Sequence, residues 1–412
     1  MLLVCAITVI CLWRVLRPQG WAAVAFALGL TGVVIATVIL TGLPMRSLPA
    51  DTAGLIGAMD GTAVDPARAD LFSGAAARTV PFQMLYPAAA PGTYAPYMPG
   101  AGPQIDAIAE NHGWMIKVLL GRTGALAAPW TMQARPATGA PMPVILYLPG
   151  VTGYMQMGSF QTSALAAKGY IVVTLNQPGA VAAAMLPDGA TPEGRIVKGL
   201  TRSDAVSLIA PSYQPAGQPL PGGFAASLAP ETSIVPYFAA DVGLVLDRLA
   251  QINADPAHVL RGRLDLDRVG VMGLSLGAIV TAQACADDAR IDACLMMDAP
   301  VPTRVTQTGL RQHALWISRP ASDQRLERAA SGGWPDSEID AQASTIGKAL
   351  SNSEKGQLVM IRGLFHIDFT DLPAIQPALG WLGQSGAVGV AKAHQQINQL
   401  TISFFARALA AR

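Results

Sequence analysis

Charged residues are scarce in this sequence of 412 residues: Asp, Glu, Lys and Arg make up 13% of it, against 51% hydrophobic residues. The net charge is only +1, and Lys and Arg are scattered. Nucleic-acid-binding proteins carry a basic stripe or patch, so nucleic acid is not expected as a partner. The four cysteines form no C-x-x-C pair, so neither a zinc ribbon nor a thioredoxin-like motif is predicted. We expect no metal and no cofactor.

Charge is absent altogether from "WAAVAFALGLTGVVIATVILTGL", residues 21–43. About 20 apolar residues suffice to cross a bilayer as a helix, so this segment is expected to span. A shorter apolar segment, 2–16, contains Arg14, whose side chain would have to snorkel to the interface, and its spanning is left open. A signal peptide is disfavoured because no positive charge precedes the apolar run and no small-residue cleavage site follows it. Residues 1–43 are therefore predicted to be a membrane anchor of one or two transmembrane helices, with the lipid bilayer as a partner.

The arginines around this anchor predict its orientation. Arg14 and Arg17 precede the span of residues 21–43, and only Arg46 follows it closely. Positive charge in short loops favours the cytoplasmic side. We therefore expect residues 44–412 to lie in a periplasmic or extracellular space.

The remaining chain has the pattern of an α/β domain. Residues 44–78, rich in Pro, Gly, Ala and Asp, are interpreted as a linker, and residues 79–412 as one large α/β domain. Continuous apolar strands alternate with helices, which predicts a mostly parallel sheet covered on both faces. The expected strands are 79–88, 143–150, 170–179, 268–273, 292–300, 313–320 and 357–363; the expected helices are 235–253, 277–286 and one from about 388. The segment 178–234, rich in Pro, Gly and Ser, is predicted to be an irregular cap that shapes the substrate site.

One serine has the sequence context of a nucleophile. In "DRVGVMGLSLGAIVTAQACADD", residues 267–288, Ser275 lies in a G-x-S-x-G motif between an expected strand and an expected helix. In that context the serine occupies a strained turn that exposes its hydroxyl. Gly273 and Gly277 are expected because side chains there would collide with the neighbouring strand and helix. The alternative is a purely structural turn.

A serine nucleophile needs a histidine to take its proton and a carboxylate to orient that histidine. The order Ser, acid, His leaves three histidines after Ser275. His366 follows the last expected strand and is the predicted base, whereas His313 begins a strand and His394 lies in a helix. The acid is either Asp298, which ends the expected strand 292–300, or Asp323, which follows the expected strand 313–320, and their spacing barely separates them.

An oxyanion hole needs two aligned backbone N–H donors. Leu276 directly follows the nucleophile, and Val151 lies in "GVTGYM" after the strand 143–150. Gly150 and Gly153 would let the backbone approach a substrate carbonyl. A phosphate-binding loop is the alternative for this glycine-rich stretch, but no G-K-[ST] or G-x-G-x-x-G follows.

The order of "LYPA", "LYLPGVTG", "KGYIVVTLNQPG", "LPDG", "LDRVGVMGLSLGA", "MMDAP" and "IRGLFHIDFTD" over most of residues 55–372 resembles the plasma-type platelet-activating-factor acetylhydrolase family and its bacterial relatives. The resemblance implies an α/β-hydrolase fold, Ser275 as nucleophile, His366 as base, Asp298 rather than Asp323 as acid, and Val151 and Leu276 as oxyanion donors. It also implies activity without metal on short or oxidised acyl esters. The chain departs from the family at Pro149, Leu274 and Ala278, which suggests a drier pocket mouth and a lipid-like acyl chain.

The sequence thus predicts a membrane-anchored serine esterase or lipase acting on short-chain or phospholipid-type acyl esters. A catalytically silent receptor or scaffold and an acyltransferase that uses the same triad are the alternatives. Cys285 and Cys294 either form a disulfide in an oxidising compartment or remain two buried thiols.

Overall fold

The computed structural model describes residues 26, 28–34, 45–48, 55–186, 195–201, 207–213 and 233–411. The chain divides into two units, residues 1–44 and 45–412. Residues 28–34 of the first unit are helical. No helix within the described residues is long and apolar enough to cross a membrane. The apolar segments 2–16 and 21–43 lie mostly outside those residues, so the anchor stays a prediction.

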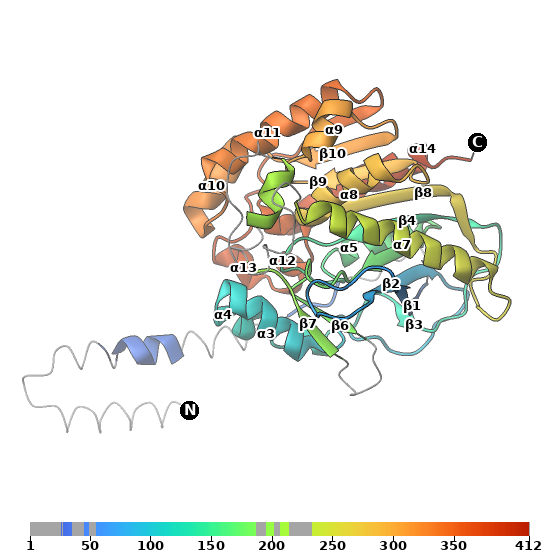
Figure 1. Ribbon diagram of the computed structural model, residues 1–412. Coiled ribbons are helices and arrows are strands. Elements are labelled where there is room, and N and C mark those ends of the chain that lie inside the picture. Colours follow the sequence, from blue (N-terminus) through green and yellow to red (C-terminus); the bar gives the residue numbers. More distant parts are fainter. Residues whose placement is uncertain are drawn as a thin grey trace, which may run out of the picture. The chain divides into compact units, whose positions relative to one another are not determined.

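The second unit is built on a nine-stranded sheet of order β11-β10-β9-β8-β4-β5-β2-β1-β3 (Figure 1). The six strands from β11 to β5 pair in parallel, and β2 is antiparallel to both β5 and β1. This confirms the predicted α/β class with a mostly parallel sheet, and the order is consistent with an α/β-hydrolase fold. The strands are β1 (Ile56–Asp65), β2 (Arg78–Pro87), β3 (Thr131–Met132), β4 (Met142–Leu148), β5 (Ile171–Leu175), β8 (Leu264–Leu274), β9 (Ala293–Met297), β10 (His313–Ser318) and β11 (Gly356–Met360).

Helices cover both faces of this sheet. Apolar side chains of α7, such as Val242, share one buried cluster with Val144 of β4. On the opposite face α14 packs against α5, and the ring of Phe405 lies over Gly270 of β8. The helices are α3 (Ala101–His112), α4 (Met115–Leu120), α5 (Ser159–Ala167), α7 (Val235–Ala254), α8 (Leu276–Asp287), α9 (Thr303–Thr308), α10 (Ala321–Ser331), α11 (Asp336–Ser351), α12 (Leu372–Ile375), α13 (Ala378–Trp381) and α14 (Val390–Ala408), with 3₁₀ turns η1 (Thr123–Ala125) and η4 (His366–Phe369).

The segment interpreted as a linker contains a strand. Strand β1 pairs with the whole length of β2. Its composition concealed it, because Gly57 and Gly61 are poor strand formers by themselves. A side chain at either position would collide with the ring of Tyr86 or Phe82 of β2. The two glycines thus make room for aromatic rings that cover them.

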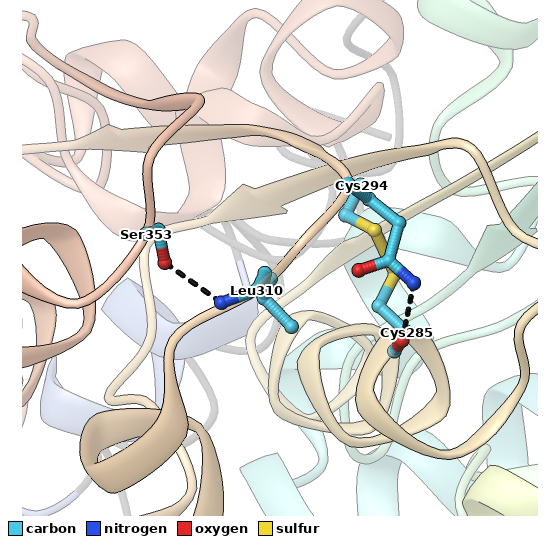
Figure 2. The surroundings of a disulfide bond; sticks show 5 residues. Cys285, Cys294, Leu310 and Ser353 are labelled. Carbon is cyan, nitrogen blue, oxygen red and sulfur yellow. Dashed lines mark hydrogen bonds between the residues drawn. A yellow bond between two sulfur atoms is a disulfide. The ribbon is translucent and has the colours of Figure 1, made fainter.

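A disulfide joins α8 to β9 (Figure 2). Cys285 lies in the last turn of α8 and Cys294 in β9, and both are buried. Nearby, Gln312 donates a hydrogen bond to the carbonyl of Cys285 at 2.7 Å. The sequence allowed either two buried thiols or a disulfide at Cys285 and Cys294, and the structure has the disulfide.

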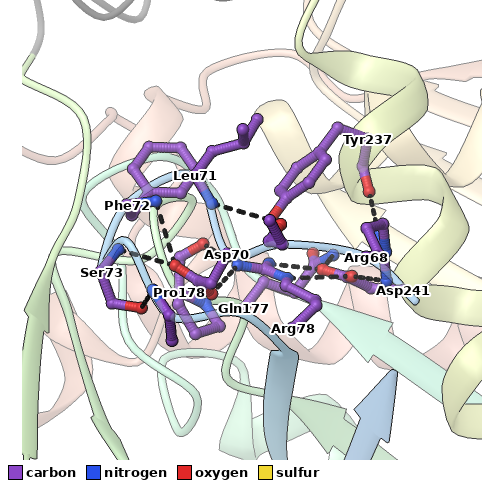
Figure 3. Close-up of polar contacts among 12 residues, drawn as sticks. Arg68, Asp70, Leu71, Phe72, Ser73, Arg78, Gln177, Pro178, Tyr237 and Asp241 are labelled. Carbon is purple, nitrogen blue, oxygen red and sulfur yellow. Dashed lines mark hydrogen bonds and ion pairs between the residues drawn. The ribbon is translucent and has the colours of Figure 1, made fainter. Parts of the chain in front are cut away.

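An ionic cluster ties together both ends of the segment 178–234 (Figure 3). Arg78, fully buried, donates to Asp241 of α7 at 2.6 Å and to the carbonyl of Pro178 at 3.0 Å. Gln177 donates to the same Asp241 carboxylate at 2.9 Å. The described part of the segment also holds the hairpin β6 (Ala183–Leu186)–β7 (Arg195–Lys198) and the 3₁₀ turn η2 (Ala210–Ser212). The residues next to the two ends of the segment, Pro178 and Asp241, therefore meet at one buried, charged cluster.

Candidate active site

Ser275 lies at the turn between β8 and α8 in a backbone conformation that side chains rarely adopt. Its φ of 57° and ψ of −122° are outside the ordinary regions for an L-residue. Its backbone N–H donates to the carbonyl of Met297 in β9 at 3.0 Å, which fixes the turn to the neighbouring strand. Strain of this kind costs about 1–3 kcal/mol and is kept where the surrounding structure enforces it.

Three glycines around Ser275 make this turn possible. A Cβ on Gly273 would lie 2.2 Å from the carbonyl oxygen of Gly277. One on Gly277 would lie 2.1 Å from the carbonyl oxygen of Leu148 in β4. One on Gly150 would approach the Cβ of Ser275 to 3.1 Å. The collisions expected from the motif at Gly273 and Gly277 are confirmed.

The structure brings Asp298 and His366 together. Asp298 follows β9, His366 begins η4 after β11, and the imidazole Nδ1 lies 2.6 Å from Oδ2 of Asp298. In the part of the chain that the structure describes, the hydroxyl of Ser275 makes no hydrogen bond to His366. Catalytic hydrogen bonds are often long before substrate binds, so this geometry is compatible with a nucleophile and base that meet during turnover.

Asp298 is held as a carboxylate by two further side chains. Arg319 donates from Nε to Oδ2 at 2.8 Å, and Gln342 donates from Nε2 to Oδ1 at 3.1 Å. Burial alone would raise the pKa of Asp298, but the Arg319 charge and the hydrogen bond from His366 lower it to about 2. An ionised Asp298 is the form that can hold an imidazole in one tautomer and stabilise its protonated state.

The alternative acid and the other histidines have different partners. Asp323 lies in the first turn of α10 and accepts the backbone N–H of Gly363 at 2.7 Å. His313 begins β10, and His394 of α14 stacks on Phe160 with ring centroids 3.7 Å apart. Asp298 is thus the carboxylate in contact with the imidazole of His366.

Val151 and Leu276 line one small cavity together with Ser275 and Asp298. Neither backbone N–H group has a hydrogen-bond acceptor among the described residues. Leu276 is the first residue of α8, where the helix dipole adds partial positive charge. The two N–H groups are therefore available to an oxyanion, as an oxyanion hole requires.

The cavity, of about 40 Å³, is more polar than the sequence suggested. Apolar and aromatic side chains form most of its wall, but Glu338 and Gln342 of α11 also face it. Tyr213 donates to Glu338 at 2.8 Å. Nothing in the sequence around Glu338 marks it as a site residue, since it follows no strand and reaches the cavity only through the packing of α11. The structure therefore adds a carboxylate to the expected dry pocket.

Arg319, which was not predicted as a site residue either, follows β10 directly. A charged residue at the carboxyl end of a parallel strand was an available signal, because sites in such sheets gather at that edge.

Among known proteins, this chain is similar to a solved structure but matches no family model and no curated protein. The structure is similar to that of a ferulic acid esterase from Streptomyces cinnamoneus, with a TM-score of 0.63 and 23% identity over 89% of this chain and 93% of that chain. At this identity the likeness shows the fold. The resemblance to platelet-activating-factor acetylhydrolases therefore stays a prediction from the sequence.

Proposed function

We propose that this protein is a serine hydrolase that cleaves carboxylic esters through Ser275, His366 and Asp298. The observation that carries the proposal is the Asp298–His366 hydrogen bond of 2.6 Å beside a cavity that also contains the strained Ser275. The likeness to an esterase structure over most of both chains supports the same chemistry.

In the proposed reaction the hydroxyl of Ser275 attacks the ester carbonyl while His366 accepts its proton. The N–H groups of Val151 and Leu276 stabilise the oxyanion of the tetrahedral intermediate. His366 then protonates the departing alcohol, leaving an acyl group on Ser275. Water, activated by His366, releases the acid by the same steps.

We infer that short acyl groups are preferred. The cavity of about 40 Å³ has room for a few water-sized groups, since one water needs about 10–15 Å³ by this measure. A long acyl chain would need more room than this cavity provides.

The proposal is tested with p-nitrophenyl esters of increasing acyl length and with a fluorophosphonate probe. Wild type should hydrolyse the short esters fastest and be labelled at Ser275, and Ser275→Ala should do neither. Hydrolysis by the Ser275→Ala variant at the wild-type rate would refute the assignment of the nucleophile. An unlabelled, inactive wild type would favour the silent scaffold. Ester formation with an added alcohol that outpaces hydrolysis would favour the acyltransferase.

A further inference from the structure

Arg319 is a buried cation with two carboxylate partners. Its side chain is fully buried, and it donates from Nε to Asp298 at 2.8 Å and from Nη1 to Glu327 of α10 at 2.6 Å. Burial disfavours its charge, but the two carboxylates raise the pKa of Arg319 above its ordinary value. Such an ion pair is costly to desolvate and contributes little net stability compared with apolar packing, so its presence calls for another explanation.

The same contacts form a closed ring that begins and ends at His366. The imidazole donates from Nδ1 to Asp298, Asp298 accepts from Arg319, and Arg319 donates to Glu327. The second oxygen of Glu327 accepts the backbone N–H of His366 at 3.0 Å. Arg319 also reaches the carbonyl of Leu364 in the same loop at 3.4 Å. The ring therefore fixes both the side chain and the backbone of the proposed base.

We propose that Arg319 and Glu327 are positioning residues that hold His366 against Asp298 and set the pH range in which His366 accepts a proton. The inference rests on the proposed function of His366. It assigns to the two residues opposite electrostatic effects on one imidazole, which packing alone would not produce.

The sign of each effect follows from charge. The positive charge of Arg319 opposes protonation of the imidazole, and the negative charge of Glu327 favours it. Other charged or titratable groups around this loop are Asp323 of α10 and Asp368 of η4, which accept its backbone N–H groups, and His394 of α14, which contacts the carbonyl of Thr370. These three groups are unaltered in the variants below, so they affect all profiles alike.

The test is the pH profile of kcat/KM on a short p-nitrophenyl ester. Arg319→Gln should move the midpoint of the acid limb up by about 1 pH unit, and Glu327→Gln should move it down by up to about 1 unit. Arg325→Gln is the matched control, because Arg325 is an exposed arginine of α10 that pairs with Asp336 and Asp340 outside the ring. Its profile should equal that of wild type.

Arg319→Lys separates charge from geometry. Lysine keeps the charge but lacks the planar donors that reach two carboxylates at once. The acid limb should stay near the wild-type position while kcat falls by about tenfold or more. If Arg319→Gln does not fold, the other two variants still test the proposal: Glu327→Gln should move the acid limb down, and Arg319→Lys should lower kcat without moving the limb.

Two results would overturn the proposal. One is a loss of activity in both glutamine variants with the acid limb unmoved, which would indicate a structural role. The other is a shift in the same direction in both. The midpoint of the His366 imidazole resonance in an NMR titration measures the same shifts without substrate. This second readout decides the proposal even if the wild-type protein hydrolyses no ester.

Discussion

Backbone strain in the described residues is concentrated at the candidate site. Four residues other than glycine have positive φ, namely Gln133, Thr152, Ser275 and Asp298. Three of them follow the carboxyl ends of the neighbouring strands β4, β8 and β9. Strain of this kind persists where the surrounding fold enforces it and is often part of a mechanism. The strained turns are therefore those that carry the proposed nucleophile, the proposed acid and the loop of the proposed oxyanion donor Val151.

At Asp298, substitution by asparagine should lower kcat/KM by about 10³–10⁴-fold. Asparagine keeps the shape of the side chain but presents no charge to His366, and it leaves Arg319 without its partner at Oδ2. Asp323→Asn is the control. Asp323 accepts the backbone N–H of Gly363 but does not contact the imidazole of His366, so activity should fall less than tenfold. Steady-state kinetics on one short ester would compare the two variants. A larger loss in Asp323→Asn would move the acid to that residue.

Glu338 should discriminate against negatively charged acyl groups. Its carboxylate faces the cavity that contains Ser275, and like charges repel strongly in a poorly hydrated pocket. Glu338→Gln should raise kcat/KM for a p-nitrophenyl ester with a free carboxylate on its acyl group by about tenfold, relative to the neutral ester of the same length. Glutamine can still accept the hydrogen bond from Tyr213, so the wall should remain in place.

The matched control for this selectivity is Asp340→Asn, an exposed carboxylate on the same helix. It should leave the ratio of the two esters unchanged. Equal rate changes for both esters in Glu338→Gln would show that Glu338 does not contact the acyl group.

Among the elements, the disulfide between α8 and β9 has a measurable expected effect. It closes a short loop, with the cysteines nine positions apart, for which chain entropy predicts about 2–3 kcal/mol of stabilisation. Cys285→Ala combined with Cys294→Ala should lower the free energy of unfolding by about this amount in urea titrations. Wild type in reducing agent should be destabilised similarly, and the double variant should not respond to the reductant. If reduction leaves the urea midpoint of the wild-type protein unchanged, this would argue against the disulfide.

Strands and helices with strong apolar patterns could be predicted from the sequence. The seven expected strands correspond to β2, β4, β5, β8, β9, β10 and β11. Strand β1 could not be predicted, since its Gly57 and Gly61 become suitable strand residues only once the rings of β2 cover them. Ser275 and Arg319 likewise differ in whether the local sequence is enough to identify them. A local motif marks Ser275, whereas the role of Arg319 depends on Glu327 and His366, which meet it only through the packing of α10 and η4.

For the whole molecule, the disulfide bears on the location of the catalytic unit, which is the unit of residues 45–412 that contains the proposed active site. Structural disulfides persist in secreted and periplasmic proteins and are rare in the cytosol, where thiols are kept reduced. The arginine pattern around residues 21–43 independently favours the same side. We propose that residues 45–412 lie outside the cytoplasm, tethered by the apolar segments that precede them.

This location predicts which side of the membrane is open to protease. Protease added to intact spheroplasts should digest the catalytic unit, while a cytoplasmic marker protein stays protected until lysis. Alkylation of free thiols under denaturing conditions at the moment of lysis should leave Cys285 and Cys294 unmodified in mass spectrometry, because they are already joined in the cell. Full protection of the catalytic unit in intact spheroplasts, together with alkylated Cys285 and Cys294, would place it in the cytoplasm. The prediction from the arginines around residues 21–43 would then be wrong, and Cys285 and Cys294 would be two buried thiols in the cell.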